Sequence, residues 1–394
     1  FHVKLILQSY ETFALSHPLW EDCNLVLDWK FLMSKKTTWT FWDKKARELS
    51  WTMPAWVKRI ESASRWQVLQ DCARSPALAT RALTECRRSW PGVKLTLRNM
   101  SLLKALSEID FIAVYGEGAI HAGLAHVPFV AIPFGGDLTI SAFRADTLGE
   151  MLRAAYAKAC RILVGDPDFI DCLARLGLPD RWTFFPCPID TDRYAPGSAS
   201  LHDVVEHVLP DSWRDSFIFF MPSRQDFYWK GTDKPLKAFL RLSRERDDVL
   251  LITPAWGADT TNALELVEES RGESQVVFLP HVLSKPHLID LYRVANLVVD
   301  QFALGSYGTS TLEAMACGKP VLTHIDADKY RPYLTCLPPN LQAMSEQAIL
   351  EKMRWAVENR DLLPDVGRES REWVVAEHNR RPIALLEDII RNHS

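Results

Sequence analysis

The chain has 394 residues, of which 47% are hydrophobic and 24% are charged, and its formal net charge at pH 7 is −4. This length is too great for one ordinary core and predicts two domains of roughly 200 residues each. The balanced charge excludes the whole-chain basic footprint of nucleic-acid-binding proteins, so no nucleic-acid partner is expected.

Short apolar runs alternate with amphipathic stretches along the first half of the chain, which is the pattern of a parallel α/β fold. A helix is expected at Thr147–Ala159, because Leu148, Leu152 and Ala155 fall on one face at helical spacing. The predicted strands of this half are Val3–Leu7, Asn24–Leu27, Val93–Leu97, Phe111–Tyr115, Pro128–Ile132 and Ile162–Val164.

A segment rich in Pro, Gly, Ser and Asp, Pro186–Ser200, predicts a linker. A second set of alternating elements follows it. Its predicted strands are Phe217–Met221, Val249–Thr253, Val276–Leu279, Leu297–Val299 and Pro320–Thr323. Its predicted helices are Pro235–Arg244, Asn262–Glu269, Leu288–Ala295, Thr309–Ala316, Glu372–Glu377 and Pro382–Arg391, the last two broken at Pro382.

A helix start rich in hydroxyl groups follows the strand that ends at Asp300. A loop with Gly305 and Gly308 leads to it, and its hydroxyl residues are Thr309, Ser310 and Thr311. Free backbone N–H groups and the helix dipole favour an anion at such a start. Glu313, one turn into the helix, is placed to accept hydrogen bonds from a ribose diol. A capped helix with a surface glutamate is the structural alternative.

Two further loops carry charged residues just after predicted strands. The loop Met221–Asp233 holds Arg224 and Lys230, two cations suited to neutralise a diphosphate, although both also suit a solvated surface. The loop Ile132–Ile140 holds Gly135, Gly136 and Asp137 at the carboxyl edge of the first predicted sheet. Ligands bind at that edge in open α/β sheets. A tight turn with the aspartate as a helix cap is the alternative.

Three sequence motifs, LEAMACGKPV, SRQDFYWKGTD and FFPCPIDTDRYAP, together resemble glycosyltransferase family four. These are retaining, metal-independent enzymes of GT-B architecture that use nucleotide sugars. The resemblance implies two Rossmann-like domains facing each other across a cleft, with the donor held by the C-terminal domain. It implies that Glu313 holds the ribose, that Arg224 and Lys230 hold the diphosphate and stabilise it as it leaves, and that amides near Gly308–Thr311 assist.

The chain departs from this family at Gly305 and Phe134, and the family's Gly-rich loop after the first strand is not visible after Leu7. Gly305 stands where the first glutamate of the family's Glu-x7-Glu pattern contacts the donor sugar, so Asp300, Gln301 or Asp137 is expected to take that contact. Phe134 stands where the family often has histidine. Two rival functions therefore stay open: a non-catalytic GT-B partner or scaffold, and a GT-B nucleotide-sugar epimerase. The epimerase needs an acid/base pair, and no convincing pair is present in the sequence.

The resemblance also implies a division of the chain. Residues 1–195 are expected to form the acceptor-side domain, residues 196–375 the donor domain, and residues 376–394 a terminal helix that packs back on the first domain. Gly136 and Asp300 are expected beside the donor, and Asp137 is expected to be catalytic with Arg224 and Lys230. His281 is a candidate for the base pocket, with a plain loop histidine as its alternative. The acceptor is expected to be a glycan, a lipid-linked acceptor or a small molecule, in cell-surface glycan or glycolipid synthesis.

Basic residues and tryptophans are interleaved along Lys30–Trp66. This composition suits binding to an anionic membrane surface, and it equally suits a helix that packs its tryptophans inward. No stretch approaches the roughly 20 apolar residues of a membrane span. Eight scattered cysteines without a Cys-x2-Cys pair indicate a reducing compartment. The chain is therefore expected to be cytoplasmic, at most peripheral at the inner face of a membrane, and to hold no metal. A targeting segment before Phe1 stays open.

Overall fold

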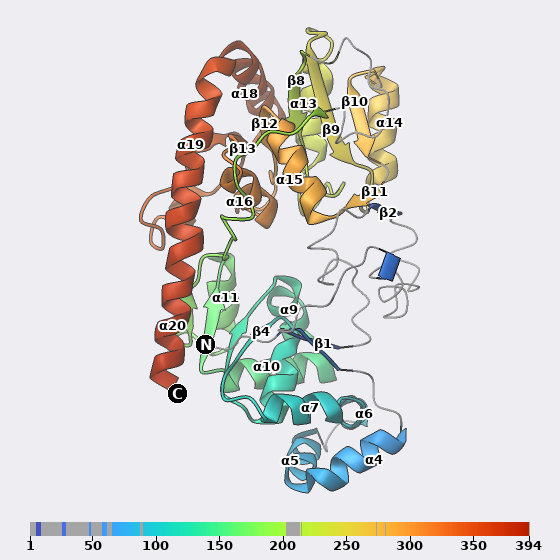
Figure 1. Ribbon diagram of the computed structural model, residues 1–394, viewed down its shortest axis with the longest axis vertical. Helices are drawn as coiled ribbons and strands as arrows, with labels where there is room; N and C mark the ends of the chain where they lie inside the picture. Colours follow the sequence, from blue (N-terminus) through green and yellow to red (C-terminus); the bar gives the residue numbers. More distant parts are fainter. Residues whose placement is uncertain are drawn as a thin grey trace. The chain divides into compact units, whose positions relative to one another are not determined.

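The computed structural model describes residues 5–8, 26–28, 47–48, 57–60, 65–86, 90–201, 213, 215–272, 274–279 and 281–393. The chain divides into two compact units. Unit 1 comprises Phe1–Thr12, Thr52–Pro186 and Pro382–Ser394, and unit 2 comprises Phe13–Trp51 and Cys187–Arg381. Each unit contains a parallel sheet with helices packed on it, which confirms the predicted α/β class (Figure 1).

Four parallel strands form the main sheet of unit 1, in the order β4 (Ile112–Tyr115), β5 (Phe129–Ile132), β6 (Arg161–Val164) and β7 (Trp182–Phe184). One face packs against α7 (Met100–Ser107), α8 (Gly118–Ala125) and α10 (Thr147–Lys158). On the other face, Leu385, Leu386 and Ile389 of α20 (Arg381–His393) pack against side chains of β5 and β6. The sheet is thus covered on both sides, as a parallel sheet requires.

The remaining elements of unit 1 lie around this sheet. A parallel pair joins β1 (Leu5–Gln8) to β3 (Val57–Ile60). The other helices are α4 (Arg65–Arg74), α5 (Pro76–Cys86), α6 (Trp90–Arg98), α9 (Gly136–Thr139) and α11 (Asp168–Arg175). The predicted strand Val93–Leu97 is wrong, because these residues lie inside α6.

Six parallel strands form the sheet of unit 2, in the order β10 (Val276–Leu279), β9 (Val249–Pro254), β8 (Phe217–Phe220), β12 (Leu297–Val299), β13 (Val321–Thr323) and β14 (Leu341–Gln342). All five strands predicted for this half are confirmed, within one residue at each end. A short antiparallel pair joins β11 (His281–Leu283) to β2 (Val26–Asp28).

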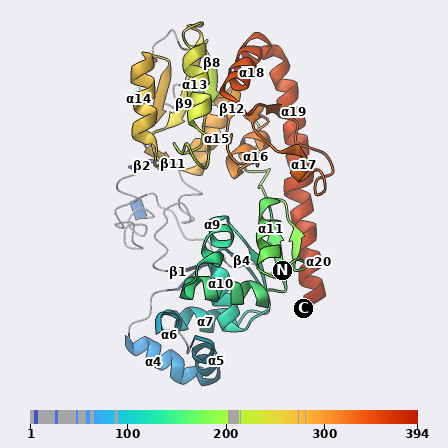
Figure 2. The same ribbon diagram turned by 180° about the vertical axis from the view of Figure 1, so that it is seen from behind.

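Helices cover both faces of this second sheet (Figure 1; Figure 2). Phe217 and Phe219 face the core formed with α13 (Asp233–Leu242), α14 (Thr260–Ser270) and α18 (Glu346–Glu358). Phe220 points to the opposite face, where the Tyr292 ring of α15 (Lys285–Val294) lies 5.6 Å from it. The other helices are α16 (Thr309–Ala316), α17 (Ala327–Tyr330) and α19 (Leu363–Val374).

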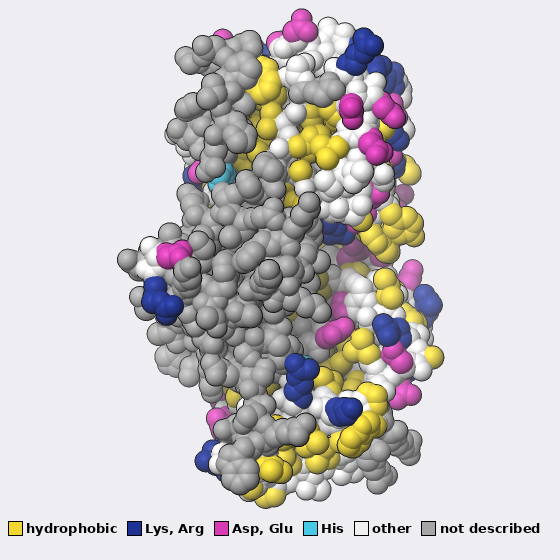
Figure 3. Space-filling view, turned by 90° about the vertical axis from the view of Figure 1, so that its right-hand side faces the viewer, with side chains coloured by type: hydrophobic (Ala, Val, Ile, Leu, Met, Phe, Trp, Pro, Cys, Tyr) yellow, Lys and Arg dark blue, Asp and Glu magenta, His cyan; other side chains and the backbone are white. Residues whose placement is uncertain are grey.

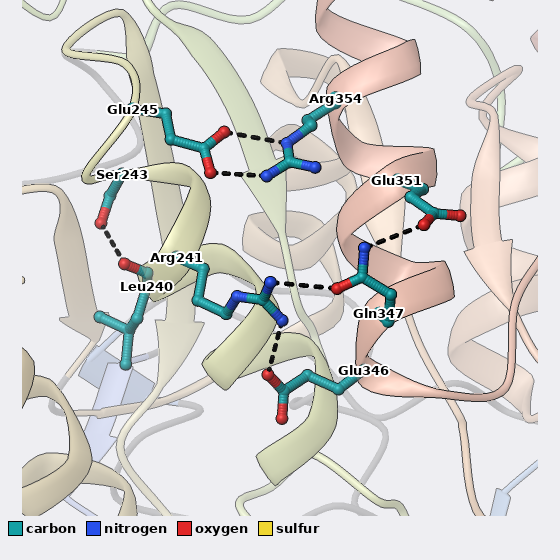
Figure 4. A network of polar contacts seen from close by, with 8 residues as sticks. All are labelled: Leu240, Arg241, Ser243, Glu245, Glu346, Gln347, Glu351 and Arg354. Atoms are coloured by element: carbon teal, nitrogen blue, oxygen red, sulfur yellow. Dashed lines mark hydrogen bonds and ion pairs between the residues drawn. The ribbon is translucent and has the colours of Figure 1, made fainter.

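Polar contacts join α13 and the turn that follows it to α18 (Figure 4). Arg354 donates two hydrogen bonds to the carboxylate of Glu245, at 2.9 and 2.6 Å. Arg241 donates to Glu346 and to Gln347, at 3.3 and 3.0 Å. Such exposed pairs contribute at most about 1 kcal/mol each, so the apolar core below them carries most of this packing.

The end of the chain is helical from α19 to α20. The predicted break at Pro382 is wrong: α19 runs into a π-helical turn, Val375–Arg380, and α20 follows it directly. Pro382 is the second residue of α20, where its missing N–H and fixed φ are tolerated.

The segment after β7, residues 187–200, contains no helix or strand and is hydrogen-bonded to the rest of unit 2. Arg371 donates to the backbone oxygens of Tyr194 and Thr191, at 2.9 and 3.1 Å. Asn379 donates to the Thr191 hydroxyl at 2.8 Å. This segment is therefore an ordered part of unit 2.

Charges of both signs are interspersed among the described residues on the face drawn in Figure 3. Within the described part of the chain, no helix has the length and apolar character needed to cross a bilayer. Most of Lys30–Trp66 lies outside the described residues, so its membrane role stays a prediction.

Candidate functional site

The side chain of Lys230, from the loop after β8, lies beside the first residues of α16. Its ammonium nitrogen is 3.4 Å from the position that a Cβ of Gly308 would take, and Gly308 is the residue just before the helix. Among the described residues, none forms a hydrogen bond or ion pair with this ammonium. A cation without a partner beside a helix N-terminus makes a site for an anion, because both carry positive charge toward the same point.

Hydrogen bonds to backbone oxygens hold the Lys230 loop and the start of α13 against the loop that follows β12. The N–H of Phe302 donates to the backbone oxygen of Lys230 at 2.9 Å, and the ammonium of Lys234 donates to the backbone oxygen of Phe302 at 3.1 Å. Gly231 allows this approach, since its φ is +65° and a Cβ there would lie 3.2 Å from the Phe302 carbonyl carbon. The two predicted anion-binding loops are thereby brought together.

Arg224 lies on the same loop but is paired. Its Nε and one terminal nitrogen donate to Oδ2 of Asp226 at 3.0 and 2.7 Å. Asp226 is buried, and its other oxygen accepts from the N–H of Trp229 at 2.8 Å. This aspartate, which the sequence analysis did not single out, neutralises part of the charge that Arg224 would offer to a ligand.

The start of α16 has no side-chain cap. Gly308 cannot supply one, and the hydroxyls of Thr309 and Thr311 have other partners. Thr311 donates to Oδ2 of Asp300 at 2.8 Å, and Ser223 donates to the other oxygen of Asp300. These hydrogen bonds tie the ends of β8 and β12 to α16, and Asp300 is buried, with 1% of its surface exposed. The first-turn amides therefore remain available to an anion.

Thr309 and Ser310 lie closer to the surface than Thr311. Thr309 is exposed and shares a side-chain hydrogen bond with Cys187. Burial raises the pKa of the Cys187 thiol, and the hydrogen bond with Thr309 opposes that rise. The thiol stays protonated at neutral pH, because burial disfavours the thiolate.

Glu313 is buried, with 3% of its surface exposed, so it is not a surface residue of a capped helix. Its Oε1 accepts from the ammonium of Lys285 at 2.6 Å and from the Tyr194 hydroxyl at 3.0 Å. Its Oε2 accepts from the Tyr292 hydroxyl at 2.9 Å. An ionised carboxylate has about four lone-pair sites, so three donors leave roughly one for a further ligand.

The three partners of Glu313 were not predicted from the sequence. Lys285 and Tyr292 are seven residues apart on α15, so both lie on one face of that helix, and this spacing was a usable signal. Burial and the Glu313 carboxylate raise the pKa of Tyr292 well above its usual value, which keeps its hydroxyl a donor. Tyr194 comes from a segment 119 residues away, and no local pattern points to it.

Gly305 adopts a backbone conformation that other residues avoid, with φ at +67°. A Cβ there would lie 3.1 Å from Cβ of Asp326 and 3.5 Å from Nε2 of His324. The neighbouring Gln301 also has a positive φ, of 62°, and its side chain is buried. The loop between β12 and α16 is therefore shaped around a glycine, and His324 and Asp326 fill the space beside it.

Restoring a glutamate at position 305 is expected to destabilise the protein. Gly305→Glu places a side chain at positive φ and against Asp326, which together cost about 1–3 kcal/mol. Chemical denaturation measures the loss. Gly177→Ala is the matched control, because its φ is +75° and nothing lies within 4 Å of the added carbon, so it isolates the backbone cost. Equal losses in the two variants would show that the contact with Asp326 is unimportant.

Asp137 and Gly136 lie in unit 1, at the carboxyl end of β5. Oδ1 of Asp137 accepts from the N–H of Phe134 at 2.9 Å, and Oδ2 accepts from the Tyr156 hydroxyl at 2.5 Å. Tyr156 is fully buried, and burial together with Asp137 raises its pKa. Asp137 thus shapes the turn that carries Gly136, and its partial exposure leaves lone pairs for a ligand.

The remaining predicted residue, His281, begins β11, and its backbone pairs with Asp28 of β2. Within the described residues, no cluster of three or more His, Cys, Asp or Glu side chains has the arrangement of a metal site. In unit 2 the structure brings together Lys230, Gly308, Thr311 and Asp300, while Glu313 forms a second centre with α15.

Comparisons with known proteins bear on this site. Residues 212–373 match the model of the family described as Glycosyl transferases group 1. None of the curated proteins matches the chain.

Solved structures resemble the chain in fold. HepE from Anabaena, solved in complex with UDP-glucose, has a TM-score of 0.60 at 14% identity, over 89% of this chain and 88% of that one. Sucrose-phosphate synthase from Thermosynechococcus elongatus has a TM-score of 0.55 at 17% identity, over 76% and 78%. The N-terminal domain of Candida albicans trehalose-6-phosphate phosphatase has a TM-score of 0.58 at 15% identity, over 90% and 87%. These likenesses confirm the predicted GT-B architecture.

Proposed function

Since residues 212–373 form a domain of the glycosyl transferases group 1 family, we propose that the chain transfers a sugar from a nucleoside diphosphate sugar to an acceptor, with retention and without a metal. One observation carries this proposal: the Lys230 ammonium, which pairs with none of the described residues, lies beside the uncapped start of α16. The diphosphate of the donor fits this point, because its charge meets the ammonium and the first-turn amides together. HepE, which shares the fold, has been solved with UDP-glucose.

The same geometry supplies the electrostatic part of the reaction. Negative charge grows on the diphosphate as the bond to the sugar breaks, so a cation fixed beside it stabilises the transition state more than the bound donor. Lys230 takes this role. Arg224 contributes less, because Asp226 neutralises part of its charge. Glu313 offers its remaining lone pair to a ribose hydroxyl. Asp137 is assigned to the sugar and acceptor side of the reaction.

A ligand screen tests the donor assignment. UDP, GDP, ADP and TDP are added alone and as nucleotide sugars. Only the compounds that carry one of these bases are expected to raise the Tm of the protein. At a ligand concentration about 100 times Kd the stabilisation is roughly 2.7 kcal/mol, or about 5–11 °C for a unit of this size. Inorganic phosphate at the same ionic strength is the control. A chain that none of the nucleotides stabilises would not be a nucleotide-sugar enzyme.

Release of the nucleoside diphosphate from the donor separates an enzyme from a scaffold. Consumption of donor with formation of a glycosylated product supports transfer, whereas recovery of an isomeric nucleotide sugar supports epimerisation. Donor binding without either reaction supports a non-catalytic partner. If the acceptor is lipid-linked, we propose that residues 30–66 attach the protein to an anionic membrane at its cytoplasmic face.

A further inference from the structure

Two large aromatic side chains are exposed at the carboxyl edge of the sheet in unit 1. Tyr115 is the last residue of β4 and is 54% exposed, and Phe134 follows β5 and is 82% exposed. The two strands are neighbours, with Tyr115 opposite Ile132 in the parallel register. Both residues therefore lie at the carboxyl edge of the sheet, which is where open α/β sheets bind ligands.

The exposure of Phe134 follows from an ordered turn. Its N–H is held by Asp137, and Asp137 is held by the buried hydroxyl of Tyr156 on α10. Gly135, with φ at +132°, permits the backbone path between them. Full burial of a phenylalanine side chain would contribute about 1.5–3 kcal/mol, which this ordered turn forgoes. A single exposed ring is ordinary, but two exposed rings at one sheet edge are the kind of grouped apolar surface that marks a binding site.

Open space and oxygen acceptors lie beside these rings. A Cβ on Gly116 would lie 4.0 Å from Cβ of Phe134 and 3.9 Å from Oδ2 of Asp137, which places the two turns against each other. At Gly135 and Gly136 a Cβ would meet nothing within 4 Å. Glu117, the residue after Gly116, is exposed, and its charge acts on Tyr156.

We infer that Phe134 and Tyr115 form a stacking platform for a saccharide acceptor, whose hydroxyls donate to Glu117 and Asp137. This inference rests on the proposed transfer reaction and names the acceptor class of that site. A sugar ring has an apolar C–H face and a rim of hydroxyl donors, which matches aromatic rings flanked by carboxylates. A lipid chain does not match, because it would strip water from two carboxylates and give them no hydrogen bonds.

Saturation-transfer NMR and calorimetry on the full chain test the platform without any donor present. The probes are the methyl glycosides of glucose, galactose, mannose and N-acetylglucosamine and their short oligosaccharides. We expect saturation transfer from the protein to the C–H protons of at least one saccharide. Phe134→Ala and Tyr115→Ala are each expected to weaken that binding by about threefold to tenfold, the usual contribution of one aromatic contact.

Matched variants distinguish stacking from general disturbance. Phe134→Tyr keeps the ring and is expected to bind as the wild type does, whereas Phe134→Leu keeps an apolar side chain and is expected to bind weakly. Trp90→Ala removes another exposed ring of unit 1, 66% exposed on α6, and is expected to have no effect. The same loss in Trp90→Ala as in Phe134→Ala would overturn the inference, as would wild-type protein that binds none of the saccharides.

The nucleotide affinity of the same samples separates this inference from the proposed function. Saccharide binding without nucleotide binding would leave the platform standing and remove the transfer reaction. Nucleotide binding without saccharide binding would overturn the platform and leave the proposed donor site standing. Binding of neutral phosphatidylcholine vesicles that Phe134→Ala abolishes would identify a lipid surface as the occupant and overturn the saccharide class.

Discussion

Lys230→Met is expected to lower kcat by about 100-fold to 1000-fold, the usual effect of removing one group that stabilises charge in a transition state. Nucleotide affinity is expected to fall much less, because the α16 amides still contact the diphosphate and the charge on it is smaller before the bond breaks. Steady-state kinetics with the donor identified by the ligand screen, together with calorimetry of the bare diphosphate, measure the two effects separately.

Two comparisons make this result specific. Lys237→Met removes a cation from the same region of unit 2, but Lys237 pairs with Asp233 at 3.1 Å and is expected to leave kcat unchanged. Arg224→Met is expected to have a smaller effect than Lys230→Met, because Asp226 already neutralises part of its charge. Normal turnover in Lys230→Met would remove this residue from the reaction and, with it, the observation on which the proposed function depends.

Glu313→Ala is expected to lower the free energy of unfolding by about 3–5 kcal/mol. The substitution leaves a partly buried ammonium and two tyrosine hydroxyls without their acceptor. For a unit of roughly 200 residues this corresponds to a fall in Tm of about 6–20 °C. Calorimetric unfolding without ligand measures it. The variant is also expected to bind nucleotide weakly, because the ribose loses its acceptor.

Glu346→Ala is the matched control for stability. It removes an exposed acid of unit 2 that pairs with Arg241, and such a pair contributes at most about 1 kcal/mol. Glu313→Gln keeps the shape and two acceptor lone pairs on its oxygen, so an intermediate loss is expected. A Glu313→Ala protein as stable as the wild type would show that the Lys285 pair contributes nothing to folding.

The sequence was most informative where local patterns and tertiary structure agree. Thr309–Ala316 begins and ends at the predicted residues, because a glycine-bearing loop precedes it and Gly318, with φ at +74°, follows it. The parallel strands of unit 2 were found for a similar reason. Four of the five, β8, β9, β12 and β13, are short runs that are buried along their whole length, as Phe217–Phe220 illustrates.

The misplaced strand Val93–Leu97 shows where this reasoning fails. Its residues alternate between apolar and polar, which favours a strand. In the structure Gly92 and Thr96, one helical turn apart, are the buried residues of α6, and Val93 and Leu95 pack partly buried against the same core. The alternation of apolar and polar residues therefore predicted a strand although the segment packs as a helix, with a small and a polar residue at its most buried positions.

The candidate site was predictable as a set of loops but not as a set of contacts. Lys230 and Gly308 lie far apart in sequence, and their proximity depends on the order of β8 and β12 in the sheet. Asp300 was expected to face the donor, yet its hydrogen bonds to Thr311 and Ser223 hold it inside. Burial and pairing of this kind arise from tertiary packing, which no single segment encodes.

The ordered segment before β8 has a practical consequence for work with unit 2 alone. The family match begins at residue 212, and a recombinant fragment trimmed to that boundary would lack Tyr194 and Thr191. Glu313 would lose one of its three donors, and Arg371 would lose two of its carbonyl acceptors. A fragment that keeps these contacts should therefore start no later than Cys187, about 25 residues before the family match begins.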